Sequence, residues 1–303
     1  MPPFMFALLV PVVLFLTFWA LCYWPLAGVV SVIKAGLKRG SARLVRSRVG
    51  KWTIGGSGPI GSYASIFLVM VVGAIAAVGA GYLFVLLAEQ FRLTTSVVYL
   101  ADQAVHTWFG HERQPAMTVL LQTATTMGGL AGETVIVAAV AVMLLVRKER
   151  ASAIFVMVTA ATGALLNTAL KMIFVRARPD VATALAVARW YSYPSGHAMA
   201  SFITFGALAY LALRQPWPWR ARSAGLAIAL TMVVLVGVSR VYLGVHWASD
   251  IAGGWSAGIV WLVTALVAFE MLLRLRQRRR GAAPTSPAAD IPDKPVPTHP
   301  AKS

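Results

Sequence analysis

The chain has 303 residues, of which 58% are hydrophobic and only 12% are charged, and its mean hydropathy is +0.73. Soluble proteins carry about 25% charged residues, so this composition excludes an ordinary soluble enzyme and indicates an integral membrane protein. The formal net charge of +17 does not indicate nucleic-acid binding, because the basic residues cluster in short loops between apolar runs. Such loops act as topology signals and attract anionic lipid headgroups.

Apolar runs of membrane-spanning length predict an all-α fold, a polytopic bundle of about six or seven transmembrane helices. In chain order the runs lie at 5–30, 63–88, 117–146, 152–174, 197–213, 223–243 and 249–273. Gly128, Gly129 and Glu133 interrupt the third run, which predicts a short leading segment followed by a span. The first run follows no positive charge and is long for a signal peptide, so we expect a retained helix.

These runs divide the chain into three predicted parts. Residues 1–60 comprise an N-terminal membrane helix and a basic cytoplasmic loop, and residues 61–281 form a membrane domain. Residues 282–303 are rich in Pro, Ala and Ser, which is typical of a disordered cytoplasmic tail. Segment 89–116 has two interpretations, a cap over a functional site or an ordinary surface loop. The single cysteine, Cys22, offers neither a disulfide nor a metal site.

Positive charge predicts the orientation of the spans. Most of the 27 Lys and Arg residues fall in alternate loops, at 34–51, 147–150, 214–222 and 274–280. Cytoplasmic loops collect positive charge, so we expect these loops inside and the remaining segments outside.

Three polar clusters lie in the predicted outer segments. They are 171–179 (KMIFVRARP), 194–197 (PSGH) and 239–250 (SRVYLGVHWASD). Charges beside hydrocarbon are costly and therefore indicate a functional site. The clusters combine cations, histidines, a carboxylate and a Ser-Gly turn, which together suit the binding of a phosphate dianion and its transfer to a nucleophile.

The third cluster contains a histidine–carboxylate pair. His246 and Asp250 are four residues apart, so on one helix they would share a face. Asp250 can then accept the proton of one ring nitrogen and leave the other nitrogen free to attack. Arg240 lies across a turn marked by Gly244, and its guanidinium can bind two phosphate oxygens at once. Taken alone, the pair is equally compatible with an ordinary interfacial helix pair.

The first cluster contains two cations at helical spacing. Lys171 and Arg178 are seven residues apart, so they point the same way if the helix continues, and Pro179 ends it soon after. The alternative is a pair of interfacial cations whose side chains extend to the headgroup region. Arg176 and Asp180 are interpreted as solvated neighbours outside the site.

The second cluster predicts the start of a helix. Ser195 is a natural N-cap, and the free N–H groups at a helix start, beginning near Gly196, attract phosphate. His197 then lies in the first turn, where it can donate a proton to a leaving oxygen. Helix capping without catalysis is the alternative for this cluster alone.

Together, the three clusters match K-x6-RP, PSGH and SR-x5-H-x3-D in order. The chain thus resembles the type 2 phosphatidic acid phosphatase superfamily, which also contains the vanadium haloperoxidases. The resemblance covers residues 171–250, and residues 1–110 carry no comparable signature. It implies that His246 is a nucleophile that becomes a phosphohistidine, that Asp250 orients it, and that His197 protonates the leaving group. It further implies that the phosphate oxygens are held by Lys171, Arg178, Ser195, Gly196 and Arg240.

The expected function is hydrolysis of a lipid phosphomonoester or diphosphate by the membrane phosphatase domain, residues 61–281. Undecaprenyl diphosphate, phosphatidylglycerol phosphate and phosphatidic acid all suit the motifs, at the outer face of a bacterial inner membrane. We expect the bilayer and a lipid phosphate as partners, no nucleic acid, and no metal or other cofactor, because the clusters hold too few carboxylates. A lipid phosphotransferase, a haloperoxidase and a non-catalytic transporter or scaffold are the alternatives, and the oligomeric state stays open.

Overall fold

The computed structural model describes residues 11–17, 19–20, 59–180, 183–188 and 190–281. The chain forms two compact units, residues 1–267 and residues 268–303. The described part of the second unit is the final stretch of one long helix. Residues 11–17 and 19–20 of the first predicted span are helical, whereas the basic loop and the C-terminal tail lie outside the described residues.

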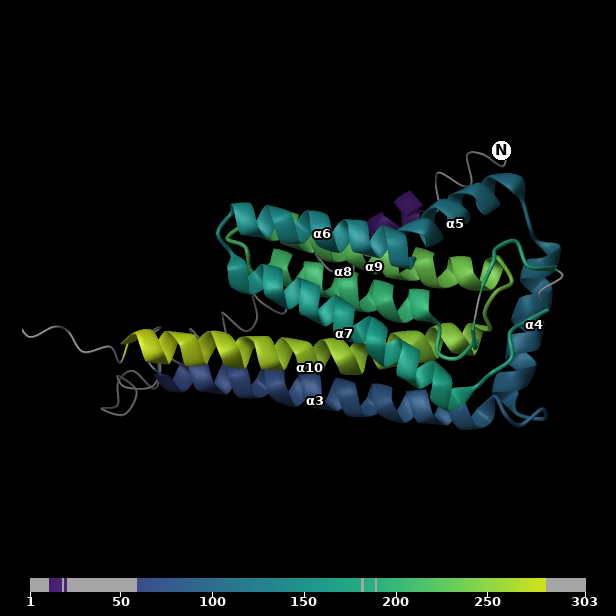
Figure 1. Cartoon of the computed structure of the whole chain (residues 1–303), viewed down its shortest axis with the longest axis horizontal. Helices are drawn as coiled ribbons and strands as arrows, with labels where there is room; N and C mark the ends of the chain where they lie inside the picture. The colour runs from purple at the N-terminus through teal and green to yellow at the C-terminus, as the bar shows by residue number, and fades with distance from the viewer. Residues whose placement is uncertain (1–10, 18, 21–58, 181–182, 189, 282–303) are drawn as a thin grey trace, which may run out of the picture. The chain divides into compact units, whose positions relative to one another are not determined.

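Throughout the described part of the chain, the regular structure is helical (Figure 1). The elements are α3 (Pro59–Gln90), α4 (Val97–His111), α5 (Pro115–Met127), α6 (Leu130–Val146), α7 (Arg150–Phe174), α8 (Gly196–Arg214), α9 (Trp219–Tyr242) and α10 (Ala248–Gly281). The predicted all-α fold is therefore confirmed. Segment 89–116, expected as a loop, holds the helix α4.

Five of the described helices are long and apolar enough to cross a membrane, namely α3, α7, α8, α9 and α10. The pair α5 and α6 gives a sixth if it is one span, although the two helices are bent by 55°. The bend falls at Gly128 and Gly129, where the sequence predicted an interruption. A Cβ atom at Gly128 would overlap the side chain of Val236, so the missing side chain allows the bend to pack closely on α9. The protein is a polytopic helical membrane protein.

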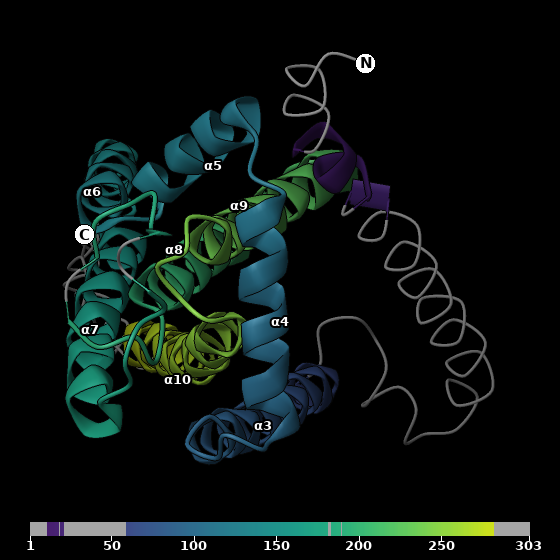
Figure 2. The same ribbon diagram turned by 90° about the vertical axis from the view of Figure 1, so that its right-hand side faces the viewer.

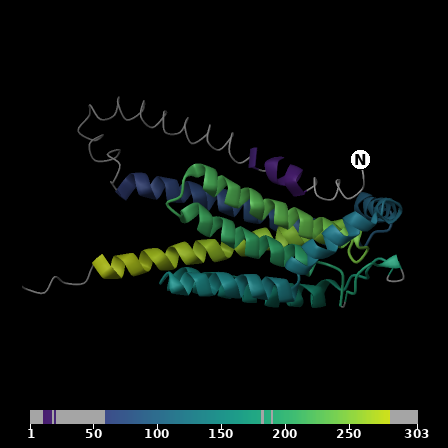
Figure 3. The same cartoon turned by 90° about the horizontal axis from the view of Figure 1, so that it is seen from above.

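Helix α8 packs against both α7 and α9, while α5 also contacts α9 and α6 contacts α7 (Figures 1 and 3). Near its start, α10 approaches α8 closely through glycines. A Cβ atom at Gly254 would lie 2.7 Å from the carbonyl oxygen of Ser195 and 3.2 Å from the nitrogen of Met199. This close approach places the first turns of α8 and α10 side by side, and the N–H of Ser195 donates to the carbonyl of Asp250 at 3.0 Å.

Buried aromatic rings fix the segment that precedes α8. Tyr193 is fully buried, and its ring contacts those of Phe84, Phe91 and Phe174. Its hydroxyl donates to the backbone carbonyl of Phe84 at 2.6 Å, so this buried hydroxyl group is satisfied. The connection between α7 and α8 is thereby anchored to α3.

The helix order brings all three sequence clusters to one end of the first unit. Helices α7 and α9 end there, α8 and α10 begin there, and α4 lies across that end (Figure 2). The basic α6–α7 and α8–α9 connections lie at the opposite end (Figure 1). The predicted separation of the polar clusters from these two basic loops is therefore present in the fold.

Candidate active site

His246 lies in the connection between α9 and α10, not on α10 itself. Helix α9 ends at Tyr242, Gly244 adopts a left-handed conformation with φ of +73°, and α10 begins only at Ala248. The expectation that His246 and Asp250 share one helix was therefore wrong, because the left-handed turn delays the helix start. The predicted contact nevertheless exists, with 3.2 Å between Nδ1 of His246 and Oδ2 of Asp250.

Asp250 is fully buried in the first turn of α10. Its Oδ2 accepts a hydrogen bond from the backbone N–H of Trp247 at 2.8 Å, as a carboxylate does in a capping box. The hydroxyl of Ser192 donates to the same oxygen. These donors hold the carboxylate with Oδ2 facing the imidazole of His246.

The partners of the two ring nitrogens define the tautomer of His246. Nε2 lies 3.1 Å from Nη1 of Arg178, and an arginine can only donate, so Nε2 accepts and Nδ1 carries the proton. Burial lowers the pKa of His246 to about 3, although the hydrogen bond to Asp250 opposes this shift. The imidazole is therefore neutral near pH 7, with its lone pair on Nε2, which is the form that a nucleophile requires.

Lys171 and Arg178 converge, but not through a continuous helix. Helix α7 ends at Phe174 because Val175 adopts a left-handed conformation with φ of 37°, so the expected helical alignment of the two cations was wrong. Instead, both side chains reach the backbone carbonyl of Tyr191, Lys171 at 2.7 Å and Arg178 at 3.3 Å. The connection before α8 brings the two cations together.

Arg240 and Ser195 bring unsatisfied polar atoms to the same end of the bundle. Arg240 lies in the last turn of α9 and is 4% exposed, and its Nη1 donates to Oγ1 of Thr125 at 2.8 Å. Among the described residues, Nε of Arg240 and the hydroxyl of fully buried Ser195 have no hydrogen-bond partner. Buried polar atoms are rarely left unpaired, so these two are candidates for binding a ligand.

Gly196 and His197 occupy the first turn of α8, with Ser195 at the N-cap position. A Cβ atom at Gly196 would lie 3.0 Å from Oδ1 of Asn167, which leaves little room for a side chain. His197 is partly buried and packs against the α5–α6 bend, since a Cβ atom at Gly129 would lie 3.2 Å from its Nε2. The bend therefore forms part of the surroundings of His197.

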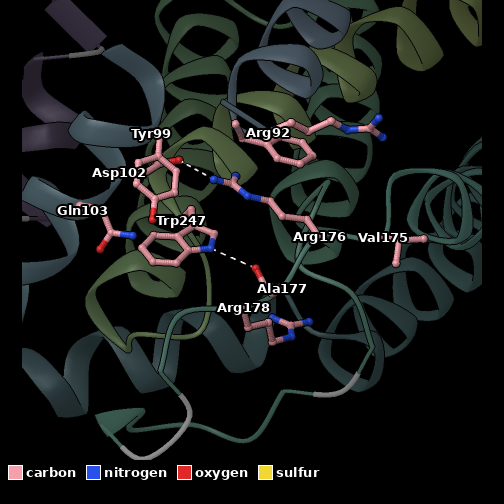
Figure 4. Close-up of a pocket in the computed structure, with 10 residues that line it drawn as sticks. Arg92, Tyr99, Asp102, Gln103, Val175, Arg176, Ala177, Arg178 and Trp247 are labelled. Carbon is pink, nitrogen blue, oxygen red and sulfur yellow. Dashed lines mark hydrogen bonds and ion pairs between the residues drawn. The ribbon is translucent and has the colours of Figure 1, made fainter. Parts of the chain in front are cut away.

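Arg176 is a site residue that the sequence interpretation missed. Its side chain is 7% exposed, and its Nη1 lies 2.6 Å from Oδ1 of Asp250. Its Nη2 lies 2.7 Å from Oδ2 of Asp102, a carboxylate on α4 that no sequence pattern singled out (Figure 4). The interpretation of Arg176 as a solvated neighbour was wrong, because α4 covers it; Asp180 is exposed, as expected.

A cavity of about 340 Å³ lies beside this ion pair, between α4 and the segment that follows α7. Arg176, Arg178 and Trp247 line one part of it, and Tyr99 and Gln103 of α4 line another (Figure 4). The indole N–H of Trp247 donates to the carbonyl of Ala177 at 3.1 Å, which fixes the ring at the wall of the cavity.

The arrangement can hold a tetrahedral anion and attack it. Lys171, Arg178 and Arg240 supply positive charge, Ser195 and the start of α8 supply hydrogen-bond donors, and Nε2 of His246 supplies a lone pair. Each predicted site residue thus lies at the same end of the bundle, and direct contacts link His246, Asp250 and Arg178.

Comparison with known proteins identifies the family. The sequence profile of the PAP2 superfamily matches residues 151–274, a range that contains all three sequence clusters. Over 196 residues the chain is 29% identical to phosphatidylglycerophosphatase B of Bacillus subtilis, a match that covers 64% of this chain and 95% of that protein. Over 68 residues it is 41% identical to an undecaprenyl-diphosphatase of Sulfolobus acidocaldarius, covering 22% of this chain and 29% of that protein.

The fold agrees with these sequence matches. The crystal structure of a transmembrane PAP2 type phosphatidylglycerolphosphate phosphatase from Bacillus subtilis superimposes with a TM-score of 0.59 at 29% identity. The superposition covers 65% of this chain and 96% of that chain. With the ordered motifs, the helical membrane fold and these matches in agreement, the chain belongs to the PAP2 superfamily.

Proposed function

We propose that this protein hydrolyses the phosphomonoester or diphosphate of a membrane lipid by attack of His246 Nε2 on phosphorus. The observation that supports this most directly is the environment of the His246 ring. Its Nδ1 lies 3.2 Å from Oδ2 of buried Asp250, and its Nε2 lies 3.1 Å from Nη1 of Arg178. The guanidinium of Arg178 can donate hydrogen bonds to a phosphate oxygen. A neutral, oriented imidazole beside a cationic pocket is what phosphoryl transfer to histidine requires.

In the first step, Nε2 of His246 forms a bond to phosphorus while the bond from phosphorus to the lipid oxygen breaks. His197 transfers its proton to that leaving oxygen, and the dephosphorylated lipid departs. Asp250 stabilises the positive charge that develops on the ring of His246 by accepting the hydrogen bond from Nδ1.

In the second step, a water molecule attacks the phosphohistidine. His197, now neutral, takes a proton from the water as the new P–O bond forms and the P–N bond breaks. Inorganic phosphate is released, and both histidines return to their starting states.

In this proposal, the negative charge of the transition state is stabilised by three cations from the same end of the bundle. Lys171, Arg178 and Arg240 contact the equatorial oxygens, together with the hydroxyl of Ser195 and the N–H of Gly196. Preorganised donors of this kind lower the barrier because they need no rearrangement during the reaction. Since these side chains supply the required charge, the proposed reaction is metal-independent.

The relatives and the charge distribution support a more specific assignment. The matched proteins are a phosphatidylglycerophosphatase and an undecaprenyl-diphosphatase, so phosphatidylglycerol phosphate and undecaprenyl diphosphate are the proposed substrates. The cluster end of the bundle lies opposite the basic α6–α7 and α8–α9 loops, and positive loops stay cytoplasmic. We therefore place the reaction at the outer face of the membrane.

The test is phosphate release by the purified protein from a panel of lipid mono- and diphosphates in detergent micelles. We expect release from at least one lipid, undiminished by EDTA, and a fall of at least about 10⁴-fold for His246→Ala. Substrate labelled with ³²P should leave acid-labile label on the wild-type protein and none on the variant. The exposed residue Arg220, at the opposite end of α9, provides the control variant Arg220→Gln.

Three results would count against the proposal. Near-normal turnover by His246→Ala would exclude this histidine as the nucleophile. Complete loss with EDTA and recovery with Mg²⁺ would indicate metal-dependent chemistry. Label that moves onto another lipid, with no free phosphate, would indicate a phosphotransferase.

A further inference from the structure

We infer that Arg176 and Asp102 are positioning residues. They hold Asp250 in the orientation that directs Oδ2 at His246, and they connect α4 to the proposed active site. This inference rests on the proposed function, since it assigns a task within the same site. Neither residue is a fixed position of the motifs K-x6-RP, PSGH and SR-x5-H-x3-D. Neither is a hydrogen-bond partner of Nε2 of His246, the atom proposed to attack.

The buried guanidinium of Arg176 donates three hydrogen bonds. Nη1 donates to Oδ1 of Asp250 at 2.6 Å and to the hydroxyl of Ser249 at 2.7 Å, and Nη2 donates to Oδ2 of Asp102 at 2.7 Å. The guanidinium also lies 4.3 Å from the ring centroid of Phe91. A planar fork can reach two carboxylates at once, whereas a lysine ammonium cannot reproduce this geometry.

The charges explain why the pair acts on Asp250. A buried carboxylate without a counter-ion is strongly disfavoured, and Asp250 is fully buried. Arg176 neutralises it through Oδ1 only, so Oδ2 remains directed at His246, Ser192 and the N–H of Trp247. The carboxylate is thus held by contacts on both oxygens, and one of them faces the imidazole.

Without Arg176, the remaining cations that interact electrostatically with Asp250 are Lys171 and Arg178, and both belong to the proposed phosphate site. Among the described residues, Lys171 and Arg240 form no ion pair with a carboxylate, which leaves their charge for the substrate. Because Arg176 pairs with Asp250, this carboxylate does not need to pair with the cations that are proposed to bind phosphate. Removing Arg176 would weaken the orientation of His246 and let Asp250 pair with those cations.

Asp102 extends the same arrangement to α4. Its Oδ1 accepts from the backbone N–H of Ser249 at 2.9 Å, and its Oδ2 accepts from the hydroxyl of Ser249 at 2.5 Å. Ser249 lies in the first turn of α10, where a carboxylate also interacts favourably with the helix dipole. One carboxylate on α4 therefore fixes both Arg176 and the helix turn that carries Asp250.

The test compares purified Arg176→Gln, Arg176→Lys and Asp102→Asn with the wild type. The readouts are kcat, KM, inhibition by inorganic phosphate, and the pH dependence of kcat. For Arg176→Gln we expect kcat to fall roughly 10- to 100-fold, with KM and phosphate inhibition changed less than about threefold. The acidic fall of kcat should move to higher pH, because loss of the cation leaves a more negative environment that favours protonated His246.

Arg176→Lys should recover part of kcat, because it keeps the charge but reaches only one carboxylate. Exposed Arg147, at the C-cap of α6 in the α6–α7 connection, gives the control variant Arg147→Gln, which should behave as wild type. A purely structural role would lower the yield or the Tm and leave kcat per folded molecule and its pH profile unchanged. That outcome would overturn the inference.

If Arg176→Gln does not fold, Asp102→Asn decides the question. Asparagine keeps an acceptor for the N–H of Ser249 but removes the charge that pairs with Arg176, so kcat should fall roughly three- to tenfold with KM unchanged. Wild-type kcat and pH profile in Asp102→Asn would overturn the inference. Failure of the proposed function would look different, because the wild-type protein itself would then release no phosphate.

Discussion

The two sides of the His246 ring lie in opposite environments. On the Nδ1 side, Asp250, Ser192, Arg176 and Asp102 form one buried, connected hydrogen-bond network. On the Nε2 side, the nearest measured group is the guanidinium of Arg178, and at the same end of the bundle the hydroxyl of Ser195 and Nε of Arg240 have no hydrogen-bond partner among the described residues.

This difference separates two tasks. A fully satisfied network is rigid and fixes geometry, whereas unsatisfied donors around a lone pair are prepared for an incoming anion. Damage to the Nδ1 side should therefore slow phosphoryl transfer at unchanged affinity, and damage to the Nε2 side should weaken the binding of phosphate as well.

After loss of the nucleophile itself, the largest effect is expected for Asp250→Asn, on the Nδ1 side. The amide cannot stabilise a positive ring, and it can present its N–H₂ to Nδ1 and so select the wrong tautomer. We expect kcat to fall by about 10²–10⁴-fold, while the inhibition constant of inorganic phosphate stays within a few-fold of wild type. Steady-state kinetics with phosphate as inhibitor measures both. A large loss of phosphate affinity at unchanged kcat would contradict the separation.

A somewhat smaller effect is expected for Arg240→Gln, on the Nε2 side. Loss of one preorganised cation should reduce kcat/KM by about 10²–10³-fold and, unlike Asp250→Asn, should also raise the inhibition constant of phosphate. Arg220→Gln is the matched control, because Arg220 lies at the other, exposed end of the same helix. Equal phosphate inhibition in Arg240→Gln and wild type would place Arg240 outside the anion site.

The smallest perturbation is a pH titration of the unmodified protein, followed through the ¹⁵N signals of His246. Burial lowers the pKa of this histidine to about 3, below the usual 6.5, so the ring should stay neutral from pH 8 down to pH 5. The shifts should report a protonated Nδ1 and an unprotonated Nε2. His246→Gln identifies the signal, and a midpoint near 6.5 would show that the ring is not shielded as described.

Much of the architecture follows from patterns in the sequence. The apolar runs placed α3 and α5 to α9 within a few residues of their observed bounds and predicted the start of α10, which continues to Gly281, well beyond the predicted end at residue 273. Gly128 and Gly129 marked the bend. Alternating spans also predicted that the three polar clusters would meet at one end, because each cluster lies where a span begins or ends. These are properties of hydrophobicity and helix length, which local sequence encodes directly.

The finer geometry depends on single backbone conformations and on contacts distant in sequence. The left-handed Val175 ends α7 before Arg178, a conformation unusual for a β-branched residue that no sequence pattern announces. The pairing of Arg176 with Asp102 joins residues 74 positions apart, across a helix that was expected as a loop. One signal could have indicated Arg176. The three sequence clusters hold four cations, Lys171, Arg176, Arg178 and Arg240, but only one carboxylate, Asp250, which needs a counter-ion if it is buried.

The bend between α5 and α6 has a consequence for how this site can diverge. Thr125, just before the bend, contacts Arg240, and Gly129, within it, lies against His197. Both positions are outside the signature stretch 171–250, and neither contacts His246 or Asp250. Under the proposed mechanism, substitutions at residue 129 would alter the surroundings of the proton donor and substitutions at residue 125 those of one phosphate-binding cation. The bend therefore offers a route by which selectivity for the lipid could change while the nucleophile and its carboxylate are kept.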